Sequence, residues 1–211
     1  MQALEHLEHL DLWGSKVTNK GAQGLKILKL LKSVNLAMTE VTVIPCLDSL
    51  TRLNLCNCSV ESIFQEDIIV GCLLKELFLS GSEFSLRDSI SSLNLQNVHL
   101  LDLASARVRD LDALVHMQEL SILDLSYTGL SDAFMPKFSE FGKNLTWLDL
   151  SNTKIGSEGI GALAGHVPKL EQLSLSGTLV DDHVFAYLVH FPALCSVNLS
   201  STKVEGKHPF I

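Results

Sequence analysis

The sequence predicts an α/β solenoid in which about nine short strands stack in parallel and a returning segment of helix or 3₁₀ turn follows each strand. Three observations predict it. The pattern Leu-x-x-Leu-x-Leu recurs about every 24 residues along the 211-residue chain. Apolar and other residues alternate within the pattern, as they do in a half-buried strand. In the longer copies, a segment that begins with helix-start residues follows the strand pattern.

The repeat runs through nearly the whole chain. Its copies begin at Leu7, Leu31, Leu50, Leu74, Val98, Leu120, Leu145, Leu170 and Leu194. The two leucines of each Leu-x-Leu lie on one face of a strand, and the residues between and beside them lie on the other. One coil cannot bury its leucines alone, so successive coils must share a continuous core.

A column of small residues ends each strand segment. It reads Ser15, Thr39, Cys58, Ser82, Ala106, Thr128, Thr153, Thr178 and Thr202. We expect these side chains to face inward, with the hydroxyl groups bonding turn backbone where they are present.

The returning segments are expected to differ along the chain. Ser157 is a candidate N-cap for a helix that ends before Pro168. Gly159 and Gly161 weaken that helix, so we expect them where it approaches the sheet or another helix closely. Pro45 predicts an irregular or 3₁₀ connection in the shortest return.

These copies resemble the leucine-rich repeat family, in particular its ribonuclease-inhibitor-like and cysteine-containing classes. The resemblance implies a curved solenoid with the parallel sheet on the concave face and the helices and 3₁₀ turns on the convex face. It also implies a non-enzymatic scaffold or adaptor that binds a protein or peptide. F-box proteins often carry this repeat class, so the substrate-recognition part of a ubiquitin ligase is one expectation. A ligand-binding ectodomain fragment of a receptor is the alternative.

The candidate binding residues are those expected on the concave face. Large apolar side chains beside an acidic column would suit a basic peptide or protein surface. The apolar group is Trp147, Tyr127, Ile122 and Leu100, the acidic column is Asp102, Asp124 and Asp149, and Phe78 and Arg52 are weaker candidates nearer the N-terminal end. The competing interpretation is that Leu-Asp-Leu-Ser is a structural feature of the repeat, and that scattered exposed apolar residues are ordinary.

Other function classes find little support in the sequence. The formal net charge is −8 and the basic residues are scattered, so we expect no nucleic-acid partner. No apolar run approaches the roughly 20 residues of a membrane helix. We find no catalytic motif and expect neither a cofactor nor a metal, since His6 and His9 lack a nearby third ligand. The five cysteines, an odd number without CxxC spacing, are expected to be free thiols in a reducing compartment.

Residues 1–211 are expected to form a single domain, cut from a longer protein because neither terminal coil has a full cap. Self-association through the uncapped ends is the alternative explanation. If Met1 is the natural start, the absence of a secretory signal predicts a cytoplasmic or nuclear location.

Overall fold

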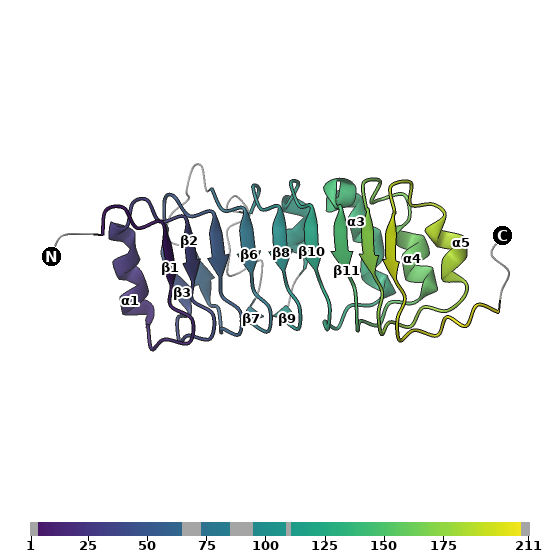
Figure 1. The fold of residues 1–211 in the computed structure, drawn as a ribbon, viewed down its shortest axis with the longest axis horizontal. Helices are drawn as coiled ribbons and strands as arrows, with labels where there is room; N and C mark the ends of the chain where they lie inside the picture. Colours follow the sequence, from purple (N-terminus) through teal and green to yellow (C-terminus); the bar gives the residue numbers. More distant parts are fainter. Residues whose placement is uncertain (1–3, 65–72, 85–94, 109–110, 208–211) are drawn as a thin grey trace. The chain divides into compact units, whose positions relative to one another are not determined.

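The computed structural model describes residues 4–64, 73–84, 95–108 and 111–207. The chain divides into two compact units, Met1–Glu119 and Leu120–Ile211. Each unit has the architecture that the sequence predicts: short parallel strands lie side by side in sequence order, and the rest of each coil returns behind them (Figure 1). The solenoid prediction is therefore confirmed within each unit, while the single-domain prediction remains a prediction.

The first unit contributes five of the strands that the repeat predicts. They are β1 (His9–Asp11), β2 (Ser33–Asn35), β4 (Arg52–Asn54), β6 (Glu76–Phe78) and β8 (Leu100–Asp102), and they pair in that order. The register joins equivalent residues of successive coils, so the middle residues Leu53, Leu77 and Leu101 are aligned.

The second unit contributes the other four: β10 (Ile122–Asp124), β11 (Trp147–Asp149), β12 (Gln172–Ser174) and β13 (Ser196–Asn198). Their register again joins equivalent positions, so Leu123, Leu148 and Leu173 are aligned. Each strand has only three residues, but backbone hydrogen bonds between coils continue into the turns, as from Tyr127 N–H to Ser151 O. The alignment does not need equal coil lengths, since Ile122 and Trp147 are 25 residues apart and Gln172 and Ser196 are 24 apart.

The core of each unit is the stack of leucines that the repeat predicts. The middle strand residue and the second residue after it point inward, as at Leu53 and Leu55 or Leu148 and Leu150, all of them fully buried. A fully buried leucine contributes about 1.5–3 kcal/mol relative to an exposed one. Because neighbouring coils share these contacts, no coil is stable by itself.

The column of small residues is the predicted hydroxyl ladder. Five of its threonine hydroxyls donate to the carbonyl three residues earlier, at 2.6 or 2.7 Å: Thr39, Thr128, Thr153, Thr178 and Thr202. Ser82 instead joins two coils, since its hydroxyl donates to Leu55 O and accepts from Cys58 N–H. The buried Cys58 thiol donates to Leu36 O, as expected for a ladder position. Ser15 is the exception, because its buried hydroxyl has no partner within the described part of the chain.

The returns of the first unit are short. They include α1 (Asn19–Gln23), η1 (Gly24–Ile27), η3 (Asp112–His116), and two pairs of two-residue strands, β3 (Val43–Ile44) with β5 (Ser62–Ile63) and β7 (Glu83–Phe84) with β9 (Arg107–Val108). The irregular or 3₁₀ return expected at Pro45 thus contains a strand, because Val43 and Ile44 find a partner in the next coil.

The returns of the second unit are helical: η4 (Asp132–Lys137), α3 (Phe138–Phe141), η5 (Gly142–Asn144), α4 (Ser157–Leu163) and α5 (Val184–Leu188). The predicted close approach of α4 is confirmed. A Cβ atom at Gly159 would lie 2.7 Å from the carboxyl carbon of Asp132, and one at Gly161 would lie 2.7 Å from the Tyr187 ring. The predicted cap is wrong, however. Gly156 is the N-cap, and the Ser157 hydroxyl donates to an Asp181 carboxylate oxygen at 2.7 Å.

Candidate functional site

The residues between the buried leucines form what we call the open face: the first and third residues of each main-sheet strand, with the turn residues that follow. In β10 and β11 these residues are half-buried while the middle leucine is buried. The register places Trp147 beside Ile122 on one side and Gln172 on the other. The sequence prediction that Trp147 and Ile122 share a face is therefore confirmed by the pairing of their strands.

A shallow hollow lies beside Trp147 on the open face of the second unit. Its lining residues are Ile122, Thr146, Trp147, Glu171 and Gln172, and its volume is about 320 Å³. That volume is at the lower end of the range for small-molecule pockets, and it is ample for one long side chain. The lining residues include two with large apolar side chains, Ile122 and Trp147, and one with a carboxylate, Glu171.

The aspartates of the predicted acidic column have a structural role. Oδ1 of Asp102, Asp124 and Asp149 each accepts a hydrogen bond from the backbone N–H two residues later, at 2.7–2.9 Å. Asn35, Asn54 and Asn198 make the same bond in their coils. An amide oxygen serves this turn as well as a carboxylate does. The interpretation of Leu-Asp-Leu-Ser as a structural feature of the repeat therefore explains why Asp or Asn occupies this position. It does not explain why these three coils have the charged residue.

The negative charge of the column is concentrated in the second unit. The register brings Asp124 beside Asp149. Burial raises the pKa of the Asp124 carboxyl, hydrogen bonds from Ser126 lower it, and repulsion from Asp149 raises it further. The net direction is upward, so this carboxylate is held at a cost in free energy that a nearby cation would reduce. Asp102 ends β8 in the first unit, where its register partner is Phe78.

Tyr127 stands in a conformation that disfavours its side chain. The second residue of the turn that follows each main-sheet strand has positive φ in all nine described coils. It is glycine at Gly14, Gly81 and Gly177, and a residue with a side chain at Met38, Asn57, Ser105, Tyr127, Asn152 and Ser201. Glycine and asparagine suit this left-handed region, whereas a bulky side chain is uncommon there. Tyr127 has φ of 55° and is 64% exposed.

The open face of the first unit brings together three charged and aromatic residues. Arg52 forms an ion pair with Glu76, its register partner, and its guanidinium carbon lies 4.5 Å from the centre of the Phe78 ring. Leu100 pairs in register with Glu76 on the next strand. The two weaker candidates, Arg52 and Phe78, thus contact each other, although the repeat pattern does not by itself predict this contact.

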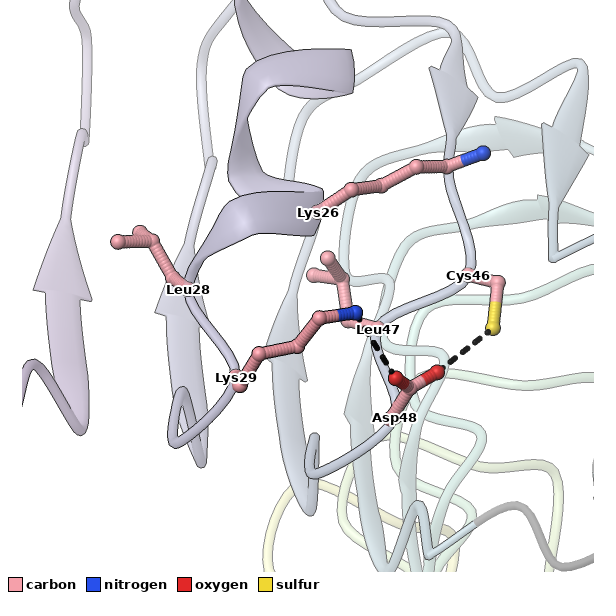
Figure 2. Close-up of a pocket in the computed structure, with 6 residues that line it drawn as sticks. All are labelled: Lys26, Leu28, Lys29, Cys46, Leu47 and Asp48. Carbon is pink, nitrogen blue, oxygen red and sulfur yellow. Dashed lines mark hydrogen bonds and ion pairs between the residues drawn. The ribbon is translucent and has the colours of Figure 1, made fainter. Parts of the chain in front are cut away.

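A second hollow, in the first unit, is lined by Lys26, Leu28, Lys29, Cys46, Leu47 and Asp48 (Figure 2). Lys29 and Asp48 form an ion pair at 3.2 Å, and the Cys46 thiol donates to the other Asp48 oxygen at 3.6 Å. The ion pair lowers the pKa of the exposed Asp48 carboxyl. These contacts satisfy the polar groups of the hollow and tie two returning segments together.

Other site chemistry finds no place in the described part of the chain. No group of three or more His, Cys, Asp or Glu residues there could hold a metal ion. None of the helices described is long and apolar enough to cross a membrane. Cys46, Cys56, Cys58 and Cys195 are free thiols, while Cys72 lies outside the described residues. Burial, aided by the Asp102 charge, raises the pKa of the Cys56 thiol to about 11, which makes it a poor nucleophile at neutral pH.

Comparison with known proteins supports the repeat assignment. The family model of the leucine-rich repeat matches residues 3–26 and 143–164. Among curated proteins, no sequence is significantly similar to this chain.

Similar solved structures are numerous. An internalin from Listeria monocytogenes, InlF, is 20% identical with a TM-score of 0.68, and the match covers 93% of this chain and 55% of that one. A leucine-rich repeat protein from Leptospira interrogans is 18% identical with a TM-score of 0.68, covering 96% and 69%. A chain of the octameric complex of Latrophilin 3, Unc5D and FLRT2, whose FLRT2 part is a leucine-rich repeat, is 16% identical with a TM-score of 0.61, covering 96% and 77%. At these identities the likeness is one of fold, and this chain spans little more than half of the internalin.

Proposed function

We propose that this chain of leucine-rich repeats is a non-enzymatic interaction module, and that the open face of its second unit binds a basic segment of a partner protein. The contact surface comprises Tyr127, Trp147, Ile122, Asp124 and Asp149. In this proposal the parallel sheet is a rigid platform, and the open-face side chains, which the core does not need, provide recognition.

The conformation of Tyr127 carries the proposal. An L-residue in the left-handed region costs about 1–2 kcal/mol, and glycine occupies the same position in three other coils. Most of the ring is nevertheless exposed, so packing gives little in return. Strain of this kind, held at an exposed aromatic residue, is typical of functional positions, and tyrosine and tryptophan are enriched among binding hot spots.

The charge of the same face supports a basic partner. The strand and turn segments 120–128, 145–153, 170–178 and 194–202 contain the carboxylates Asp124, Asp149 and Glu171 and no lysine or arginine. Like charges on neighbouring strands destabilise the free protein slightly, and attraction to a cationic partner would offset that repulsion.

Selection from a displayed library of random dodecapeptides tests the proposal. The purified chain is the bait, and the dissociation constants of the enriched peptides are then measured with purified variants. Tyr127→Gly and Trp147→Ala should each weaken binding at least about tenfold, which corresponds to 1.4 kcal/mol. Val189→Ala, at a residue that is 72% exposed just after α5, is the matched control and should change nothing. Enriched peptides that bind both open-face variants with native affinity would contradict the proposal.

The finer proposal is an intracellular adaptor, with the substrate-recognition part of a ubiquitin ligase as the role that the resemblance suggests. The four described free thiols support a reducing compartment. Thiol titration of the unfolded, non-reduced natural protein separates this from a receptor ectodomain. Five titratable thiols support the adaptor, whereas paired cysteines, with glycans on Asn57, Asn144 or Asn198, support the ectodomain.

A further inference from the structure

We infer that the hollow beside Trp147 receives an arginine side chain of the partner. This inference rests on the proposed function, because it names the group that the open face recognises. Three of the residues that line the hollow carry groups that an arginine can use: Trp147 an aromatic ring, Ile122 an aliphatic side chain and Glu171 a carboxylate.

Among the polar groups of the residues that line the hollow, the Glu171 carboxylate is available to a cation. The Thr146 hydroxyl is occupied, since it donates to Ser121 O at 3.1 Å. Glu171 binds its neighbouring strands only through its backbone: its N–H donates to Thr146 O, and its carbonyl accepts from Cys195 and Ser196. The exposed Glu171 carboxylate forms no ion pair with any residue in the described segments. A cation from outside would therefore meet an uncommitted acceptor.

The first unit shows the same combination of groups already complete. There the Arg52 guanidinium lies over the Phe78 ring and pairs with the Glu76 carboxylate, so aromatic face, cation and acid belong to one chain. The second unit supplies an aromatic residue and an acid at its hollow, but its open-face segments contain no cation. In our inference the partner supplies this cation.

Arginine fits this set better than lysine does. Its planar guanidinium stacks on an aromatic ring and can donate two hydrogen bonds to one carboxylate, and it is less strongly hydrated than an ammonium group. The carboxylates of Asp124 and Asp149, farther along the same strands, add a field of the same sign without direct contact. Because burial and mutual repulsion hold the pKa of Asp124 above its usual value, an approaching cation also relieves a strain present in the free protein.

A charge series on the selected peptides tests the inference. Each enriched arginine is replaced by citrulline, which keeps the shape and removes the charge, and by lysine. Binding is followed through the fluorescence of Trp147 in a Trp13→Phe background. Citrulline should weaken binding to the native chain at least about tenfold, and lysine should weaken it less. Glu171→Gln should reduce the distinction between arginine and citrulline, because only the contribution of this carboxylate is removed. Glu140→Gln, at an exposed residue of α3, is the matched control and should leave the distinction intact.

The outcomes separate the two proposals. Two results overturn the inference and leave the proposed function standing. In the first, the enriched peptides bind through Tyr127 and Trp147 but carry no arginine. In the second, citrulline replacement costs the same affinity with Glu171→Gln as with the native chain. If no enriched peptide depends on Tyr127 or Trp147, both proposals fall.

Discussion

Replacing Tyr127 tests whether this residue is held at a cost to folding. Glycine at position 127 would remove the left-handed penalty of about 1–2 kcal/mol, but it adds about 0.5–1 kcal/mol of chain entropy to be lost on folding. Because Tyr127 is 64% exposed, the ring keeps only about a third of an aromatic side chain's burial, roughly 60 Å² or about 1.5 kcal/mol. The net expectation for Tyr127→Gly is a free energy of unfolding within about 1 kcal/mol of the native value.

Alanine at the same position isolates the backbone contribution. Tyr127→Ala loses the ring and keeps the left-handed penalty, so it should be less stable than Tyr127→Gly by about 0.5–1 kcal/mol. Urea unfolding followed by circular dichroism measures both. Gly14→Ala is the reference for the same difference between alanine and glycine without side-chain contacts, because Gly14 has φ of 62° and a Cβ there would meet nothing within 4 Å. A strained Tyr127 is contradicted if Tyr127→Ala is as stable as Tyr127→Gly or more stable. It is also contradicted if Tyr127→Gly lowers the free energy of unfolding by more than about 3 kcal/mol, a loss typical of a packed aromatic side chain.

Two further substitutions test the open face and the returning helices. Asp124→Asn keeps an oxygen for the turn and removes the repulsion from Asp149, so it should unfold at higher urea concentration than the native chain at neutral pH. Because the pKa of Asp124 is raised in the folded protein, the stability of the native chain falls as pH rises from about 4 through that pKa. The stability advantage of Asp124→Asn should therefore shrink as the pH is lowered. Asp124→Ala removes the hydrogen-bond acceptor and should lose about 1 kcal/mol of stability. Gly159→Ala should destabilise the protein by about 1–3 kcal/mol, because the new Cβ meets the Asp132 carboxyl group. This loss outweighs a gain of about 1 kcal/mol in helix propensity. A higher melting temperature for this variant would contradict the packing of α4 against Asp132.

Much of the fold is local enough to be read from the repeat. The alternation in Leu-x-Leu determines which residues are buried, and the near-constant spacing determines which residues share a register, as Asp124 and Asp149 do. The candidate residues Trp147 and Ile122 follow from the same reasoning, since facing depends on the period of a strand and not on its neighbours. Gly159 and Gly161 could be assigned to close contacts because glycine has no other reason to stand inside a short helix.

Several features depend on contacts between coils, and no single coil contains the information that specifies them. The structural bonds of the aspartate column could have been suspected from the asparagines that share it, but the hydrogen bonds appear only once the turns are folded. The cap of α4 lies one residue earlier than predicted, because the hydroxyl of Ser157 finds Asp181 in the next coil.

The solenoid, the phase of its repeat and the composition of its open face can all be deduced from the amino-acid sequence, because each follows from a short period that repeats. Tertiary structure decided which open-face groups are already occupied. Arg52 is held by Glu76 and Phe78, whereas Glu171 and Trp147 line an open hollow. It also showed that Tyr127 stands where the backbone favours glycine. The physical reason is that side-chain pairing and free surface depend on residues of different coils, such as Arg52 and Glu76, which no local pattern relates.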